Sequence, residues 1–384
     1  TASVRSRFDT NIRRLGETQP LPSGQRRPDF LTTPSISGAI ALPIGRQQLF
    51  AGAEFGRDFY ARNSQLDRNR YRVGGGINLR AGARCTGSVA SEYSSRQVQQ
   101  SEVAGLRGGV QNTLTFGGEA NCRAGVGLGF GGSVRHVQIR NSDPVRQAYD
   151  LDSTVYAPQL SYALPVLGQL SLGGSLNQTR YKRRPAFLPD GSIVEDGVDI
   201  YSGRVGFSRA LGSRLQISLG ASYLNTKPNP GTVLGIDGPT NRPSFSGLGY
   251  DGSIVYRAGP RLTATLQAGR DVRANPNVGA QYRIAENYGI DLDYKLGRAI
   301  SVGTGVTYDL NQYRGSFFAT PDEPLQRVSD RLTRVYGSLS YSPVKLYSLS
   351  LEVAHQDRAS RPSLYSYKST SVLLQLRVNF GRQS

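Results

Sequence analysis

The chain has 384 residues, including 46 Gly and 46 Lys or Arg against 28 Asp or Glu, which gives a formal net charge of +18. No stretch approaches the roughly 18 consecutive apolar residues of a transmembrane helix, so a helical membrane protein is excluded. A helical bundle is excluded as well, because each glycine inside a helix costs about 1 kcal/mol. With 21 Tyr, 13 Phe and regular patterning, the chain is not disordered either.

The sequence contains no methionine. Because translation starts with Met, we expect an N-terminal segment to have been removed, most simply a secretory signal peptide. Removal of an initiator Met before Thr1, or trimming of the chain, is the alternative. We therefore expect an exported protein.

From the N-terminal region onward, apolar and polar residues alternate strictly in many segments. Clear examples are residues 214–225, 346–357 and 368–380. Such a period of two is typical of β-strands with one apolar and one polar face. The apolar face carries Leu, Val, Ile and Tyr, as expected against lipid. The polar face is small and mixed, as expected in a water-filled lumen.

The connections between these segments alternate between tight turns and long polar loops. Tight turns occur at residues 44–46, 82–84, 211–213 and 296–298, and long loops at 17–28, 143–152, 228–242 and 320–330. A soluble sandwich of this length would need two or three domains with linkers, and the composition shows no break. We predict an all-β fold: a closed antiparallel up-and-down transmembrane β-barrel in the bacterial outer membrane.

The strand count follows from parity. Residues 30–380 contain 17 clear strands, and an odd number would leave the N-terminus outside the cell. A weak first strand within residues 2–15 restores an even number. We thus predict one barrel over residues 1–384, in which residues 1–29 supply the weak first strand and the first outer loop. About 18 strands are expected, and 16 strands with a periplasmic N-terminal arm is the alternative.

The two cysteines fall at neighbouring strand ends. Cys85 opens a strand directly after the turn at residues 82–84, and Cys122 closes the next strand. Antiparallel pairing brings the two positions within disulfide range at the periplasmic rim. The periplasm is oxidising. We predict a structural disulfide; two free thiols is the alternative.

Arginine supplies 41 of the 46 cations. Some arginines fall in or near long connections, such as Arg146, Arg184 and Arg242, where they are expected to meet lipopolysaccharide phosphates. Six others occupy the polar register inside strands: Arg72, Arg80, Arg135, Arg204, Arg334 and Arg377. An arginine that faces lipid at mid-bilayer costs about 2–4 kcal/mol, so we expect these six to face the lumen.

Acidic residues on the same register, for example Glu92, Glu119 and Glu352, are expected to pair with part of this charge. The surplus would attract small anions or an anionic polysaccharide, as rings of arginine do in channels. The patterned membrane barrel argues against nucleic acid as a partner.

No catalytic constellation is present in the sequence. His136 and His355 lie on different strands, both on the apolar register, and are expected to be interfacial rather than metal ligands. The run Gly74, Gly75, Gly76 lies inside a strand and lacks the strand-to-helix context of a phosphate-binding loop. No enzyme activity, metal or cofactor is expected.

Residues 49–81, the Pro-rich start and the terminal strand at residues 372–380 resemble the "putative β-barrel porin" family of outer-membrane proteins found with exopolysaccharide synthesis and export machinery. The resemblance implies an 18-stranded barrel that acts as the outer-membrane conduit of a secreted polysaccharide, with a periplasmic export partner. It supplies no functional residues. Residues 381–384, which follow Phe380, depart from chains that end on the terminal aromatic residue.

Three functions therefore remain compatible with the sequence. The first is export of an exopolysaccharide, which could be anionic. The second is a general or anion-selective diffusion porin, and the third is a structural or adhesive surface barrel. An outer-membrane enzyme is disfavoured because no Ser, His and Asp set converges.

Overall fold

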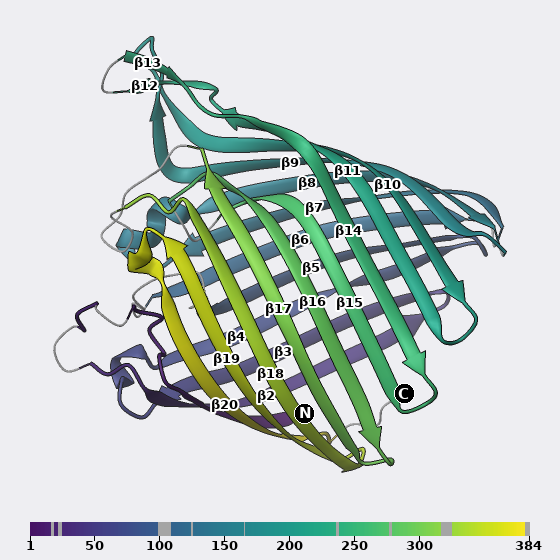
Figure 1. The fold of residues 1–384 in the computed structure, drawn as a ribbon. Helices are drawn as coiled ribbons and strands as arrows, with labels where there is room; N and C mark the ends of the chain where they lie inside the picture. Colours follow the sequence, from purple (N-terminus) through teal and green to yellow (C-terminus); the bar gives the residue numbers. More distant parts are fainter. Residues whose placement is uncertain are drawn as a thin grey trace.

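The computed structural model describes residues 1–16, 19–21, 25–98, 109–123, 126–164, 166–235, 238–275, 279–315 and 325–380. Its body is a barrel of 18 strongly tilted antiparallel strands (Figure 1). The strands are β1 (Ala2–Asp9), β2 (Asp29–Ile44), β3 (Gln47–Tyr60), β4 (Arg68–Ala81), β5 (Cys85–Gln97), β6 (Val110–Arg123), β7 (Gly127–Asn141), β8 (Leu151–Leu164), β9 (Gly168–Phe187), β10 (Ile193–Leu211), β11 (Leu215–Asn229), β14 (Phe245–Ala258), β15 (Leu262–Ala274), β16 (Tyr282–Leu296), β17 (Ile300–Arg314), β18 (Ser329–Val344), β19 (Tyr347–Arg361) and β20 (Tyr367–Val378).

The connections add small elements. A separate hairpin of β12 (Thr232–Gly235) and β13 (Gly238–Asn241) projects from the loop end (Figure 1). Short 3-10 helices are η1 (Ser64–Leu66), η2 (Pro144–Tyr149) and η3 (Ser363–Tyr365). No helix within the described ranges is long and apolar enough to cross a membrane.

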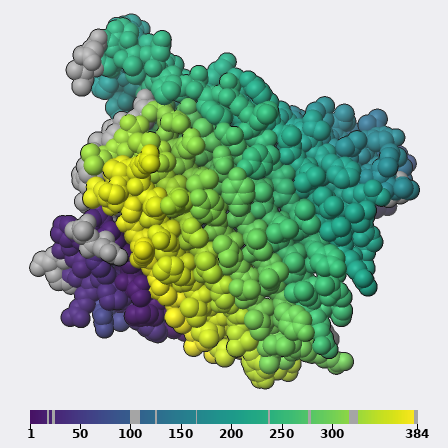
Figure 2. All heavy atoms as spheres, in the orientation of Figure 1, coloured from purple at the N-terminus to yellow at the C-terminus, as the bar shows by residue number. Residues whose placement is uncertain are grey.

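The sheet closes on itself through β1. This strand pairs with β2 on one side and with β20 on the other, so that Ala2 lies opposite both Ile36 and Val378. On the outer surface the first and last strands are neighbours (Figure 2). The predicted fold class and the count of 18 strands are confirmed. β1 lies within the predicted range of residues 2–15. It ends at Asp9, where the chain turns and the backbone N–H of Asn11 donates to the Asp9 carboxylate at 2.9 Å.

The predicted tight turns lie at one end of the barrel. Gly45 and Gly82 have φ of +61° and +64°, a left-handed conformation that glycine adopts without strain. The long loops gather at the opposite end. Parts of the predicted loops at residues 17–28 and 320–330, namely 17–18, 22–24 and 320–324, lie outside the described residues.

The outer face is an apolar band. Leu219, Leu349 and Leu374 are 39–49% exposed on this face, although they are apolar. Exposed tyrosines flank the band on both sides, as in the aromatic girdles of outer-membrane barrels. The tyrosines near the turns are Tyr162, Tyr256, Tyr294, Tyr341 and Tyr347. Those towards the loops are Tyr71, Tyr201, Tyr223, Tyr250 and Tyr288.

Towards the loop end the same outer register carries ion pairs instead of apolar residues. Arg140 lies 2.6 Å from Asp152, and the Arg270 side chain lies 3.4 Å from Glu286. Because charged side chains are costly against lipid, the lipid-facing band ends on the turn side of these pairs.

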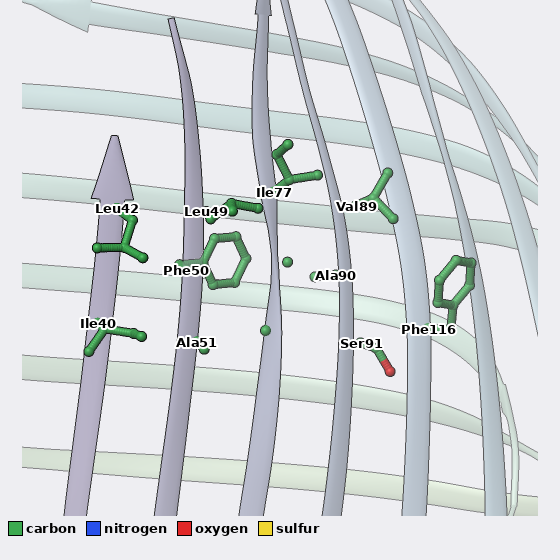
Figure 3. Close-up of a pocket in the computed structure, with 12 residues that line it drawn as sticks. Ile40, Leu42, Leu49, Phe50, Ala51, Ile77, Val89, Ala90, Ser91 and Phe116 are labelled. Atoms are coloured by element: carbon green, nitrogen blue, oxygen red, sulfur yellow. The ribbon is translucent and has the colours of Figure 1, made fainter. Parts of the chain in front are cut away.

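The outer face is also indented. Across β2 to β6 a shallow apolar groove runs between Ile40 and Phe116, with the small residues Ala51 and Ser91 on its floor (Figure 3). The groove belongs to the lipid-facing side, since Ile40, Ala51, Ser91 and Phe116 share the register of the exposed apolar band.

On one side of the loop end the barrel wall splits. Pairing of β14 with β15 stops at Tyr250 and Arg270, while β15 and β16 continue together up to Ala274 and Tyr282. Beyond the split, lumen-register residues of β10 and β11 pack against outer-register residues of β15 and β16, in a buried cluster of Val198, Ile200, Leu224, Val272, Tyr282 and Ile284. The β15–β16 hairpin therefore lies inside the wall formed by β10 and β11 and narrows the outer mouth.

Candidate functional site: the arginine-lined lumen

The lumen wall carries polar contacts that cross a whole strand. Arg204 on β10 donates from Nε and Nη2 to the Asp251 carboxylate on β14, at 2.8 and 2.6 Å. The intervening strand, β11, carries Gly220 at this level. A Cβ there would lie 2.4 Å from both Arg204 Nη2 and Asp251 Oδ1, so glycine makes the bidentate pair possible.

A second set of polar contacts spans β16 to β19, and one of them crosses a strand. Arg334 on β18 lies 2.5 Å from Glu352 on β19, and its guanidinium stacks 4.7 Å from the centre of the Tyr336 ring. The Tyr336 hydroxyl donates to Asp291 on β16, across Gly305 of β17, where a Cβ would meet both side chains. These contacts form one polar chain along the inner wall.

The register places the six predicted arginines on the face that carries these bridges, but it does not bring them together in one cluster. Arg72 lies 3.5 Å from Glu92, so three of the six have carboxylate partners. Within the described part of the chain, Arg80, Arg135 and Arg377 form no ion pair. The acids Asp251 and Asp291, which the sequence did not single out, take part in place of Glu119.

A cavity of about 390 Å³ lies inside the barrel between β1 to β5 and β19 to β20, next to residues 10–16 (here loop 1), of which Arg14 lines it. Five arginines line it: Arg5, Arg7, Arg14, Arg70 and Arg96. None was among the predicted site residues. Arg70 could have been found, since it lies two positions before Arg72 in the same alternating run.

The lining of this cavity is positively charged. It contains five arginines and one acid, Asp58, which gives 5 − 1 = +4. Arg14 is neutralised by Asp9 at 2.9 Å, and Glu54 lies 3.9 Å from Arg70, which leaves +2. Among the described residues, Arg5, Arg7 and Arg96 have no carboxylate partner.

Buried ion pairs fix the loops around the mouth. Asp330 on β18 is 3% exposed, lies 2.5 Å from Arg358 and accepts the Tyr313 hydroxyl at 2.7 Å. Burial raises the pKa of Asp330, but the charges of Arg358 and Arg327 and its hydrogen bonds outweigh burial and hold it below its usual value. Burial and the Asp330 carboxylate raise the pKa of Tyr313 to about 12.

Three arginines that were expected in or near long connections, and in contact with lipopolysaccharide, are buried instead. Arg184 and Arg242 are 2% and 6% exposed and lie 2.5 and 2.7 Å from Asp196, and Arg146 is 3% exposed beside Tyr149. The expectation that these three meet lipopolysaccharide is therefore wrong. The extended β9 and β10 strands enclose Arg184 and Asp196 instead, because a buried carboxylate needs a cationic partner.

At the turn end, Cys85 and Cys122 lie directly opposite each other on β5 and β6 and are joined by a disulfide, with their Cα atoms 4.0 Å apart. His136 and His355 each contact a threonine on the neighbouring strand, Thr154 at 2.8 Å and Thr370 at 2.9 Å. No group of three or more His, Cys, Asp or Glu that could hold a metal occurs in the described part of the chain.

Residues 240–380 match the model of the family described as "Putative beta-barrel porin 2". The resemblance to β-barrel porins is confirmed for this segment. It contains the last seven strands of the barrel, β14 to β20. No curated protein sequence matches the chain.

Among solved structures, the barrel is similar to a BenF-like porin from Pseudomonas fluorescens Pf-5, with 10% identity and a TM-score of 0.50 over 98% of both chains. It is also similar to the FrpB iron transporter from Neisseria meningitidis (10% identity, TM-score 0.53) and to FpvA from P. aeruginosa (9%, 0.52). The chain covers only 63% and 59% of those two proteins, although 94% and 100% of it is aligned. At these identities the similarity shows the fold, a porin-like outer-membrane barrel, and this fold points to the bacterial outer membrane.

Proposed function

We propose that the protein is a conduit for anionic compounds across the bacterial outer membrane, with an acidic exopolysaccharide as its cargo. The observation that carries this proposal is the excess of arginine over acid on the inner wall. Arg80, Arg135 and Arg377 form no ion pair with a carboxylate in the described residues, and neither do Arg5, Arg7 and Arg96. Cations in a confined aqueous space raise the local concentration of anions, and salt weakens the effect.

The distribution of the arginines suits a polymer. They lie on many strands and at different heights along the wall, and several are partly neutralised, as Arg334 is by Glu352. A moving chain of acidic sugars would meet a series of weak, exchangeable contacts rather than one tight site. The resemblance to porins associated with polysaccharide export supports this cargo, and it implies a periplasmic export partner. Lipopolysaccharide would be the partner on the outer surface.

Deletion of the gene tests the cargo. We expect secreted acidic polysaccharide to fall in the deletion strain and to recover with the unmodified gene. A variant with Arg80, Arg135 and Arg377 changed to Gln should insert into the outer membrane normally. It should restore only part of the polysaccharide secretion. Unchanged secretion in the deletion strain would refute the export assignment.

The second candidate is an anion-selective diffusion porin. The observation in its favour is the alignment with the BenF-like porin over 98% of both chains. Liposome swelling separates the two candidates: rapid entry of small organic anions, together with intact polysaccharide secretion in the deletion strain, would establish the porin. A structural or adhesive barrel would give neither rapid entry of organic anions into liposomes nor a loss of secretion in the deletion strain.

A further inference from the structure

We propose that the cavity below loop 1 is a binding site for one acidic sugar unit, whose carboxylate is held by Arg5, Arg7 and Arg96. This inference rests on the proposed function and names the chemical group that the lumen recognises. The cavity, at about 390 Å³, falls in the size range of small-molecule sites. Most of its residues come from the inner register of seven strands, so it opens to the lumen rather than to lipid.

The first argument is charge. The cavity keeps a net charge of +2 after the nearby acids are counted, and Arg5, Arg7 and Arg96 have no carboxylate partner among the described residues. Guanidinium groups bind carboxylates through short, charge-assisted hydrogen bonds that can be bidentate. An anion is therefore the ligand class that this wall favours.

The second argument is a set of buried polar atoms without partners in the protein. Arg7 Nε, Gln97 Nε2 and Gln356 Oε1 are buried, line the cavity and form no hydrogen bond within the described residues. The Gln97 Oε1 atom accepts the Tyr60 hydroxyl at 2.6 Å, which orients the amide and leaves its Nε2 as a donor. These two donors and one acceptor lack hydrogen-bond partners among the described residues, whereas buried polar groups normally form hydrogen bonds. A bound ligand would supply the missing partners.

This set distinguishes an acidic sugar from a simple inorganic anion. Carboxylate and hydroxyl oxygens accept from Arg7 and Gln97. Gln356 Oε1 needs a donor, which a sugar hydroxyl supplies and a fully ionised sulfate does not. The remaining wall includes Leu31, Leu373 and the Tyr60 ring, apolar surfaces that suit the C–H face of a sugar ring.

Calorimetry on the full barrel in detergent tests the site, with glucuronate, glucose and sulfate as probes. We expect saturable binding of one glucuronate, weakening as salt rises, and at least tenfold weaker binding of glucose and of sulfate. Arg7→Gln and Arg96→Gln should each weaken glucuronate binding at least tenfold. Arg46→Gln, at an exposed arginine in the turn after β2 and away from the cavity, is the matched control and should leave glucuronate binding unchanged.

Heat-modifiable mobility on gels confirms that each variant is folded, and having two cavity variants keeps the test valid if one fails to fold. Equal binding of glucose and glucuronate, equal binding of sulfate and glucuronate, or wild-type affinity in both cavity variants would overturn the proposal. Absence of glucuronate binding in a barrel that still prefers anions would refute the sugar site and leave the conduit standing. A preference for cations would instead refute the proposed function.

Discussion

Placing an arginine on the outer face of β19 should destabilise the barrel strongly. Leu351 is 38% exposed on this face, opposite Leu339 and Leu374 on the adjacent strands. It lies halfway between Tyr347 at the turn end and His355, and thus near the middle of the apolar band. An arginine at the bilayer midplane costs about 2–4 kcal/mol. Leu351→Arg should therefore lower the folding equilibrium constant about 30- to 700-fold.

The neighbouring residue supplies the control. Ser350 faces the lumen between Ser340 and Gln375, so Ser350→Arg adds the same charge to a wet surface and should change stability by about 0.5 kcal/mol or less. Urea titration in lipid vesicles measures both. Because the chain has no Trp, unfolding is followed by far-UV circular dichroism and gel mobility. Equal costs for the two variants, or a larger cost for Ser350→Arg, would refute the assignment of the two faces.

Three further outcomes test the rim and the mouth. Cys85 and Cys122 should resist alkylation before reduction, and free thiols in unreduced protein would contradict the pairing. Changing both to Ser should lower the free energy of unfolding by at most about 4 kcal/mol, the loop-closure entropy of a 37-residue separation. Asp330→Asn removes the buried carboxylate that Arg327 and Arg358 both contact, and it should cost about 3–5 kcal/mol in the same urea assay. A cost below 1 kcal/mol would show that the cluster is not buried. The pKa of Asp330 is lower in the folded state than in the unfolded chain, so its contribution to stability is present above about pH 4 and is lost as the pH falls through the folded value. The Asp330→Asn variant should lack this acid-induced loss of stability. Equal acid sensitivity of the variant and the unmodified protein would contradict the assignment.

The barrel itself could be predicted because its information is local. Apolar and polar residues alternate with a period of two in each strand, and residues such as Gly45 and Gly82 mark the turns. This alternation identified which residues face lipid. The disulfide followed from the same register, since Cys85 and Cys122 sit at the same level of neighbouring strands. The weak strand β1 was found through the even-number rule rather than through its own pattern.

The cavity and the mouth could not be predicted in the same way. Arg5 and Arg7 lie in β1, where Ser and Arg obscure the alternation, although both share the register of Asp9. The split wall depends on packing between β10 and β15, whose residues Val198 and Val272 share one buried cluster. The two residues lie far apart in the sequence, and nothing local signals that they come together. The cavity likewise depends on bringing strands from both ends of the chain together.

The reversal potential of the purified barrel in a planar bilayer, under a potassium chloride gradient, tests the central claim most directly. Opposing arginine-lined walls act within a few Debye lengths, about 8 Å each at physiological salt, so the unmodified barrel should prefer chloride over potassium. Changing Arg72, Arg135 and Arg334 to Gln should reduce that preference, and so should high salt. A preference for potassium in the unmodified barrel would contradict an anion-attracting lumen.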